Sequence, residues 1–372
     1  MISPARRLAA RFLLPVVLVL LPLVVALAQT PVPVPAVPES VRPPAKAVTG
    51  DPEPDMVTVV PQPAVTDLWR QIRRGVEGKV SIPDPLAGVL IQSEGELWRT
   101  LRNGPYRVYS ALFLLAVVIA LAVFFVLRGR IRLRQGRSGV RIRRFGFFER
   151  FSHWVTATSF ILLGLTGLNM LYGREVLMPL LGRSGFATLT LYGKITHNYV
   201  AFAFMAGLTL LFLQWVWFNL PNRHDIVWLL KGGGLFGGHA PSKKFNAGQK
   251  LMFWIVILGG VSLSLSGLQL LFPYQLHFFQ SVFRFLESWL ALGLPTELTA
   301  LQEQQLAAVW HGLSGIVMIG VILGHIYIGT LGMEGAVEAM WQGEVDLNWA
   351  REHHDLWVEE LTRKGVVPQA AE

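Results

Sequence analysis

The chain of 372 residues contains no cysteine. It therefore has no disulfide, no thiolate nucleophile, no iron–sulfur cluster of its own, no cysteine-ligated zinc site and no c-type haem attachment. Any redox chemistry on this chain must use histidine or methionine ligands, or an organic cofactor. The nine histidines are therefore the informative residues.

Charge is also scarce. Charged residues make up 15% of the chain and apolar residues 52%, whereas soluble domains carry about 25% charged residues. Five segments contain no Asp, Glu, Lys or Arg at all: 110–127, 151–171, 197–219, 251–272 and 306–329. At about 1.5 Å per helical residue, each can cross about 30 Å of hydrocarbon, the first only just. The sequence thus predicts an all-α integral membrane protein with five spans.

The first 28 residues resemble a signal peptide. Three arginines precede the apolar run of 13–25, and Ala26-Leu27-Ala28 is a small-residue cleavage pattern. An uncleaved anchor is the alternative, and both interpretations place the next segment outside the cytoplasm. Residues 29–105 are proline-rich at first, which favours an extended linker, and end in a small amphipathic element.

Basic residues in the connecting loops predict the orientation. From the first loop to the last, the Lys and Arg counts are nine, three, five and one. By the positive-inside rule, the first loop is cytoplasmic and the N-terminal region is periplasmic. The arginine run therefore needs no nucleic-acid partner to explain it. We expect a multi-pass protein of the bacterial inner membrane, with its C-terminus in the cytoplasm.

This pattern predicts five segments along the chain. They are a signal peptide (1–28), a periplasmic linker with a small amphipathic element (29–105), an extra transmembrane helix with a basic cytoplasmic loop (106–150), a four-helix domain (151–330) and a cytoplasmic amphipathic tail (331–372).

Four of the nine histidines fall inside spans, where an ionisable group is costly and usually has a partner or a function. His311 and His325 share the last span and are fourteen residues apart. This spacing is about 21 Å along a helix and leaves both rings on nearly the same face. The last span runs from outside to inside, so His311 lies at the outer level and His325 at the inner level. His197 begins its span at the outer surface, and His153 begins its span at the inner surface.

Depth therefore pairs His197 with His311 outside and His153 with His325 inside. Two imidazoles from separate helices can clamp a flat cofactor and fill both axial positions of a haem iron, which leaves none for oxygen or substrate. The sequence predicts a four-helix dihaem cytochrome b core that carries electrons across the bilayer. Zinc is a weaker alternative because neither pair has a third or fourth ligand nearby. A proton relay is also weaker, because the spans contain no carboxylate.

Seven glycines on these helices fit the hypothesis, because a porphyrin edge needs close backbone approach, although small residues also serve ordinary helix packing. They are Gly164, Gly167, Gly207, Gly312, Gly315, Gly320 and Gly324. The other five histidines are predicted to be solvated and to bind no iron: His224, His239, His277, His353 and His354.

Several motifs resemble the gamma subunit of membrane-bound formate dehydrogenase, a cytochrome b556. They are RFGFFERFSHW, GKITHNYVAF, LPNRHDIVWLL, KKFNAGQKLMFW, WHGLSGIVMIGVILGHIYIG and GEVDLNWAREHH. The resemblance covers about residues 143–357 and implies a four-helix core with two b haems, ligated by the histidine pairs given above. Shorter relatives begin near residue 145, so the role of the extra N-terminal region stays open.

The resemblance also implies a quinone site near His325, formed by Asn246, Gly248 and Gln249. Amide groups at a membrane boundary can bond a quinone carbonyl, but from the residues alone Asn246 suits a helix N-cap equally well. The implied partners are a molybdenum-containing alpha subunit, which oxidises formate outside, and an iron–sulfur beta subunit, which passes electrons to the outer haem. Quinone reduction at the inner haem would then contribute to the proton-motive force.

Two alternatives remain open. Cytochromes b of nickel–iron hydrogenases and thiosulfate-type reductases use similar four-helix dihaem modules with other soluble partners. A transporter or a non-redox membrane anchor would be a different class of protein, and it would lack b-type absorption bands.

Overall fold

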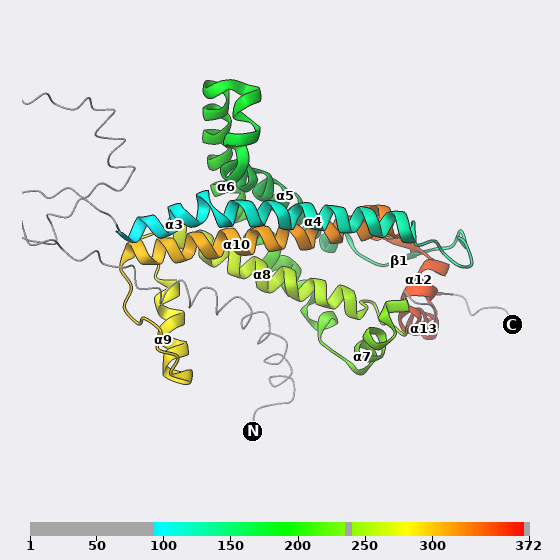
Figure 1. Cartoon of the computed structure of the whole chain (residues 1–372). Coiled ribbons are helices and arrows are strands. Elements are labelled where there is room, and N and C mark those ends of the chain that lie inside the picture. The colour runs from blue at the N-terminus through cyan, green and yellow to red at the C-terminus, as the bar shows by residue number, and fades with distance from the viewer. Residues whose placement is uncertain (1–92, 235–239, 368–372) are drawn as a thin grey trace, which may run out of the picture. The chain divides into compact units, whose positions relative to one another are not determined.

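The computed structural model describes residues 93–234 and 240–367. The predicted signal peptide and most of the predicted linker lie outside these residues. In the described part, five helices are long and apolar enough to cross a membrane (Figure 1), which confirms the predicted all-α membrane fold. They are α4 (Pro105–Arg128), α5 (Phe147–Val176), α6 (Met178–Trp215), α8 (Ala247–Leu271) and α10 (Ala300–Tyr327).

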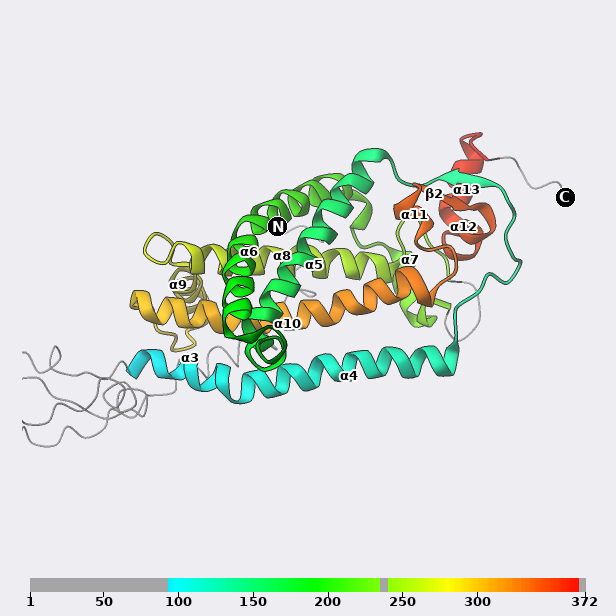
Figure 2. The same cartoon turned by 90° about the horizontal axis from the view of Figure 1, so that it is seen from above.

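The helices are longer than the apolar runs that predicted them. Helix α6 already begins at Met178, although the charge-free run begins at His197. The hydrocarbon core limits where charged side chains can lie, but it does not end a helix. Only Leu177 separates α5 from α6, so the two form a helical hairpin (Figure 2). Near the start of α6, Gly182 has a φ of +71°, a left-handed conformation that interrupts the helical geometry.

Two of the long helices are extended by tighter or wider turns. Helix α6 continues into the 3₁₀ turn η2 (Val216–Asn219), and α10 continues into the π-helical turn η4 (Ile328–Gly332). The shorter helices before the last membrane helix are α3 (Ser93–Asn103), α7 (Arg223–Leu230), η3 (Gly232–Gly234) and α9 (Phe278–Leu290).

The described chain divides into two units, one of residues 93–99 and 280–305 and the other of residues 100–234, 240–279 and 306–367. In the smaller unit, Arg284 Nε donates to the carbonyl oxygen of Thr296 at 2.9 Å, and the backbone N–H of Gln280 donates to Glu303 at 2.7 Å. All the residues predicted to bind haem or quinone lie in the larger unit.

Residues 131–145, 240–246 and 333–367, which connect or follow the membrane helices, pack together into a small cap. Strand β1 (Arg141–Arg143) pairs antiparallel with β2 (Glu344–Asp346). The remaining elements of the cap are α11 (Glu338–Trp341), α12 (Leu347–His353) and α13 (Asp355–Arg363). Its buried core consists of Ile142, Phe145, Val345, Trp349 and Trp357 with their neighbours. The cap is thus packed like a water-soluble domain.

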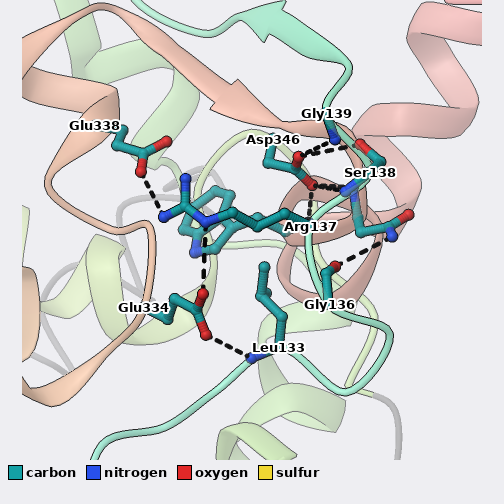
Figure 3. Close-up of polar contacts among 10 residues, drawn as sticks. Leu133, Gly136, Arg137, Ser138, Gly139, Glu334, Glu338 and Asp346 are labelled. Atoms are coloured by element: carbon teal, nitrogen blue, oxygen red, sulfur yellow. Dashed lines mark hydrogen bonds and ion pairs between the residues drawn. The ribbon is translucent and has the colours of Figure 1, made fainter.

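Within the cap, ionic and polar contacts join the loop after α4 to residues 333–367 (Figure 3). Arg137 forms ion pairs with Glu338 at 2.7 Å and with Glu334 at 3.5 Å. Asp346 accepts hydrogen bonds from the backbone N–H groups of Ser138 and Gly139 at 3.2 and 3.0 Å. The basic loop that fixed the predicted orientation is therefore also a structural part of the cap.

The extra helix α4 lies along α10 (Figures 1 and 2). An ideal Cβ on Gly312 of α10 would lie 2.6 Å from the hydroxyl of Tyr106, and one on Gly320 would lie 2.7 Å from the ring of Phe113. Ser110 of α4 also forms a 2.6 Å hydrogen bond with Tyr172 of α5. These contacts make α4 an integral part of the helical bundle.

Candidate functional site

The four histidines of the membrane helices lie in two pairs. His197 of α6 faces His311 of α10 with ring centroids 6.1 Å apart, and His153 of α5 faces His325 of α10 with centroids 6.2 Å apart. These are the two couples expected from depth. One helix, α10, supplies one member of each pair, and the two arms of the α5–α6 hairpin supply the other members.

The ring separations fit a metal held between the two imidazoles. A metal–nitrogen bond to histidine is about 2.0 Å long and a ring nitrogen lies about 1.1 Å from its centroid, so trans imidazoles on one metal have centroids about 6.2 Å apart. Among the described residues, no group of three or more His, Cys, Asp or Glu side chains could hold a metal ion. A bare zinc ion would lack ligands here, whereas a haem iron brings four of its own. The residues therefore fit haem.

Hydroxyl groups orient the rings of the His197–His311 pair. Thr166 Oγ1 lies 2.8 Å from Nδ1 of His197 and also donates to the carbonyl oxygen of Leu162 at 2.7 Å. Ser266 Oγ lies 3.0 Å from Nδ1 of His311 and donates to the carbonyl oxygen of Ser262 at 2.9 Å. Each hydroxyl has one proton, so it must accept the N–H of the histidine.

Both rings then carry their proton on Nδ1, which leaves the lone pair of Nε2 free for a metal. Histidines that ligate metals usually donate their other ring N–H in this way. In the second pair, Nδ1 of His153 is buried and has no hydrogen-bond partner within the described structure. The two pairs therefore differ in how their rings are held.

The seven glycines singled out in the sequence have different surroundings. An ideal Cβ on Gly207 would lie 2.5 Å from Oγ1 of Thr156, so Gly207 serves helix packing, as Gly312 and Gly320 do against α4. In contrast, a Cβ on Gly167 would come no closer than 3.7 Å to His197, and one on Gly324 would meet nothing within 4 Å. Gly164 and Gly315 likewise meet only ordinary contacts, so Gly324 is the one of these four positions that faces open space in the described structure.

The amide residues predicted at the quinone site lie in the first turn of α8. Asn246 is its N-cap, and Asn246 Oδ1 accepts the backbone N–H of Gln249 at 2.9 Å. In return, Gln249 Oε1 accepts the backbone N–H of Asn246 at 3.2 Å. The third residue, Gly248, packs against α7, because an ideal Cβ there would lie 2.9 Å from the ring of Trp228.

A buried arginine and a buried histidine adjoin this turn. Nη2 of Arg144 lies 2.7 Å from the carbonyl oxygen of Lys244, 2.9 Å from Nε2 of His354 and 3.2 Å from Oε1 of Gln249. Burial lowers the pKa of Arg144 to about 9, so it stays charged at neutral pH. Burial and the charge of Arg144 hold the pKa of His354 well below its usual range.

The prediction that His354 is solvated is wrong, because its side chain is fully buried. It lies between α12 and α13, and its Nδ1 is 2.7 Å from the carbonyl oxygen of Lys243. In the sequence, the position of His353 and His354 next to Trp349 and Trp357 suggested an amphipathic helix at the membrane surface. The chain instead folds back over the loop before α8, so a tertiary contact determines the burial of this residue.

Sequence reasoning also missed Thr166, Ser266 and Arg144, whose side chains contact the predicted site residues. Thr166 and Ser266 could have been noticed as hydroxyl residues inside apolar spans, although most such hydroxyls bond only to their own helix. Nothing in the sequence separates Arg144 from the other arginines of its loop, because its burial depends on the tail.

Comparison with known proteins places this chain in a family. A model of the prokaryotic cytochrome b561 family matches residues 144–343. The cytochrome b556(Fdn) subunit of the nitrate-inducible formate dehydrogenase of Escherichia coli K12 is 27% identical over 235 residues, covering 62% of this chain and 96% of the relative. The cytochrome b556(fdo) subunit of a formate dehydrogenase of the same strain is 30% identical over 219 residues, covering 58% and 90%. A formate dehydrogenase cytochrome b556 subunit of Haemophilus influenzae is 26% identical over 231 residues, covering 60% and 84%.

Proposed function

This chain belongs to the prokaryotic cytochrome b561 family of multi-pass membrane electron carriers, and from this premise we propose that it is the dihaem cytochrome b subunit of a formate:quinone oxidoreductase. Formate oxidation itself takes place on a partner subunit. The chain anchors the complex in the membrane and conducts electrons to quinone. The similarity to three cytochrome b556 subunits of formate dehydrogenases supports formate as the electron donor.

In this proposal each histidine pair holds one b haem. His197 and His311 bind the haem on the periplasmic side, and His153 and His325 bind the haem on the cytoplasmic side. When bound, each haem would supply one-electron redox chemistry, and the histidine pair would provide the protein's two ligands to its iron. The chain contributes the axial ligands and the space between helices.

The surrounding side chains hold the ligands in place. Hydroxyls of Thr166 and Ser266 accept the Nδ1–H of His197 and His311 and keep Nε2 directed at the metal. Helix α4 braces the ligand helix α10 through the contact of Tyr106 with Gly312, next to His311. A ligand set fixed in this way changes little between redox states, which suits electron transfer.

The proposed orientation places the cap and the C-terminus in the cytoplasm of a bacterium and the region before α4 in the periplasm. Loop arginines support this orientation by the positive-inside rule. The proposed partners are a molybdenum-containing alpha subunit, which would oxidise formate to carbon dioxide, one proton and two electrons, and an iron–sulfur beta subunit, which would pass the electrons to this chain on the periplasmic side. Quinone takes two electrons and two cytoplasmic protons, so turnover transfers charge across the membrane.

We further propose that Asn246, Gly248 and Gln249 bind the quinone beside the cytoplasmic haem. The side-chain oxygens of the two amides are used within the first turn of α8. Their amino groups have no hydrogen-bond partner among the described residues, and both side chains are only half-buried. Such groups can donate to a quinone carbonyl. Capping and quinone binding are therefore compatible roles of the same residues.

The observation that carries the proposal is the meeting of two histidine pairs with ring centroids 6.1 and 6.2 Å apart, a separation at which both imidazoles could bind one metal. The test uses the complex purified from membranes and placed in sealed vesicles with a quinone. Formate should reduce b-type haem and build a membrane potential. A response to hydrogen but not to formate would instead assign the chain to a hydrogenase, and the absence of b-type absorption would rule out a cytochrome.

A further inference from the structure

Arg144 is an unusual residue, because it is a buried cation without an acidic partner in the described structure. Its side chain is 5% exposed. The ion pairs of the described residues leave it out, and Glu149, the acidic residue whose charge acts on it, is bonded to Lys244 at 2.9 Å. Burying a charge is costly unless other groups stabilise it. Such a residue is expected to have a function that offsets the cost.

Neutral groups take the place of a carboxylate around Arg144. The guanidinium carbon lies 5.0 Å from the ring centroids of both Phe145 and Trp349, and 6.0 Å from that of Trp357. Aromatic faces attract cations, and a contact without water is stronger than an exposed one. This aromatic cage holds the guanidinium in place without supplying a negative charge to pair with it.

His354 fixes the direction of one amino group of Arg144. Arginine can only donate, so Nε2 of His354 must accept from it. His354 is then neutral and carries its proton on Nδ1, next to the carbonyl oxygen of Lys243 at 2.7 Å. The histidine therefore acts as a buried acceptor that holds the arginine beside the first turn of α8.

Arg144 in turn fixes the orientation of the Gln249 amide. Gln249 Oε1 lies 3.2 Å from Nη2 of Arg144 and 3.2 Å from the backbone nitrogen of Asn246, and both partners can only donate. The oxygen must therefore point inward to these two groups. A flipped amide would bring its amino group against two donors, and the backbone N–H of Asn246 would lose its acceptor.

We propose that Arg144 is a positioning residue of the quinone site, which holds the Gln249 oxygen inward and so presents the Gln249 amino group as a hydrogen-bond donor to a quinone carbonyl. The inference rests on the proposed role of Gln249 in binding quinone. The charge of Arg144 also polarises the amide, since hydrogen bonds in a chain strengthen one another. The amino group becomes a better donor to an oxygen that gains negative charge as electrons arrive.

The test follows the reoxidation of reduced haem by quinone in the purified complex. The haems are reduced with formate, the complex is mixed with decylubiquinone or menadione, and the decay of the b-type absorption band is recorded against quinone concentration. Arg144→Met should raise the apparent KM for quinone about five- to tenfold, the effect of one lost hydrogen bond. Arg144→Lys, which keeps the charge, should recover part of the loss. Arg143→Met removes the exposed arginine that ends β1, next to Arg144, and should behave like the wild type.

A purely structural role predicts a different result. It would lower the amount of assembled complex or the haem content, but each remaining complex would show a normal KM. A normal KM in Arg144→Met, together with a raised KM in Gln249→Ala, would overturn the proposal for Arg144 alone. A normal KM in Gln249→Ala would instead overturn the quinone role of Gln249, on which the proposal depends.

If Arg144→Met does not assemble, a second variant tests whether the Gln249 amino group donates to quinone. In Gln249→Glu the new carboxylate can pair with Arg144 but has no amino group to donate. We expect this variant to assemble with two haems, to be at least as stable to heat as the wild type, and to show a KM raised about five- to tenfold by the lost donor. A wild-type KM in this variant would refute the proposal.

Discussion

The hydrogen bond between Ser266 and His311 should tune the potential of one haem only. Ser266→Ala removes the oxygen that lies 3.0 Å from Nδ1 of His311 and accepts its proton. An imidazole that donates its second N–H is a more basic ligand, and a more basic ligand stabilises oxidised iron more than reduced iron. Loss of this acceptor should therefore raise the midpoint potential of the haem that we propose for His197 and His311.

The strength of the contact bounds the size of the shift. A hydrogen bond of this kind contributes about 0.5–1.5 kcal/mol. For a one-electron couple, about 1.4 kcal/mol corresponds to about 59 mV. If the contact acts mainly on the oxidised state, the potential should rise by about 20–60 mV, while the potential of the other haem stays constant.

The assay is a redox titration of the purified protein followed by its b-type absorption bands. Ser264→Ala is a matched control. Ser264 lies on the same helix, but among the described residues its hydroxyl bonds only to the carbonyl oxygen of Gly260, at 2.7 Å. We expect two potentials in each variant, with one raised in Ser266→Ala alone. An unchanged pair of potentials, or a shift of equal size in Ser264→Ala, would refute the claim that the Ser266 hydroxyl acts on the iron through His311.

Two further predictions concern stability. Gly207→Ala should destabilise the α5–α6 hairpin by about 1–3 kcal/mol, since the new Cβ would lie 2.5 Å from Oγ1 of Thr156, and thermal unfolding should show the loss. Gly329→Ala, with nothing within 4 Å of its Cβ, is the control and should change little. Asp346→Asn should destabilise the cap by about 1–2 kcal/mol at pH 7, because the carboxylate accepts charge-assisted hydrogen bonds from the backbone. Burial raises the pKa of Asp346, but hydrogen bonds from Ser138 and Gly139 lower it, and the net shift is downward. The stabilisation by the carboxylate is therefore present above about pH 4 and is lost as the pH falls. The difference between wild type and variant, followed by tryptophan fluorescence, should therefore shrink at acid pH, and a constant difference would contradict this cause.

The sequence was sufficient to predict the membrane helices and the histidine pairs. Hydrocarbon excludes charge, so the charge-free runs located every long helix. Helix periodicity and alternating span direction then fixed the depth of each histidine, which is why His311 and His325 could be assigned to different partners before any contact was known. Both inferences use local geometry along one helix or the simple order of spans.

Features that depend on long-range packing could not be predicted. The burial of His354 requires the tail to fold over the loop before α8, and the burial of Arg144 requires the same event. Likewise, the charge-free run that begins at His197 predicted only the second half of α6, because the helix extends beyond the apolar run. Glycine patterns were ambiguous for the same reason, since only the neighbouring helix tells whether Gly207 or Gly324 faces a side chain or open space.

The most direct test of the central claim is a haem count on single histidine variants of the purified protein. His197→Ala and His311→Ala should each lose the same haem, identified by its midpoint potential, and His153→Ala and His325→Ala should each lose the other. Wild-type protein should contain two b haems. Loss of one haem in a different grouping, or retention of both haems in any of the four variants, would contradict the account.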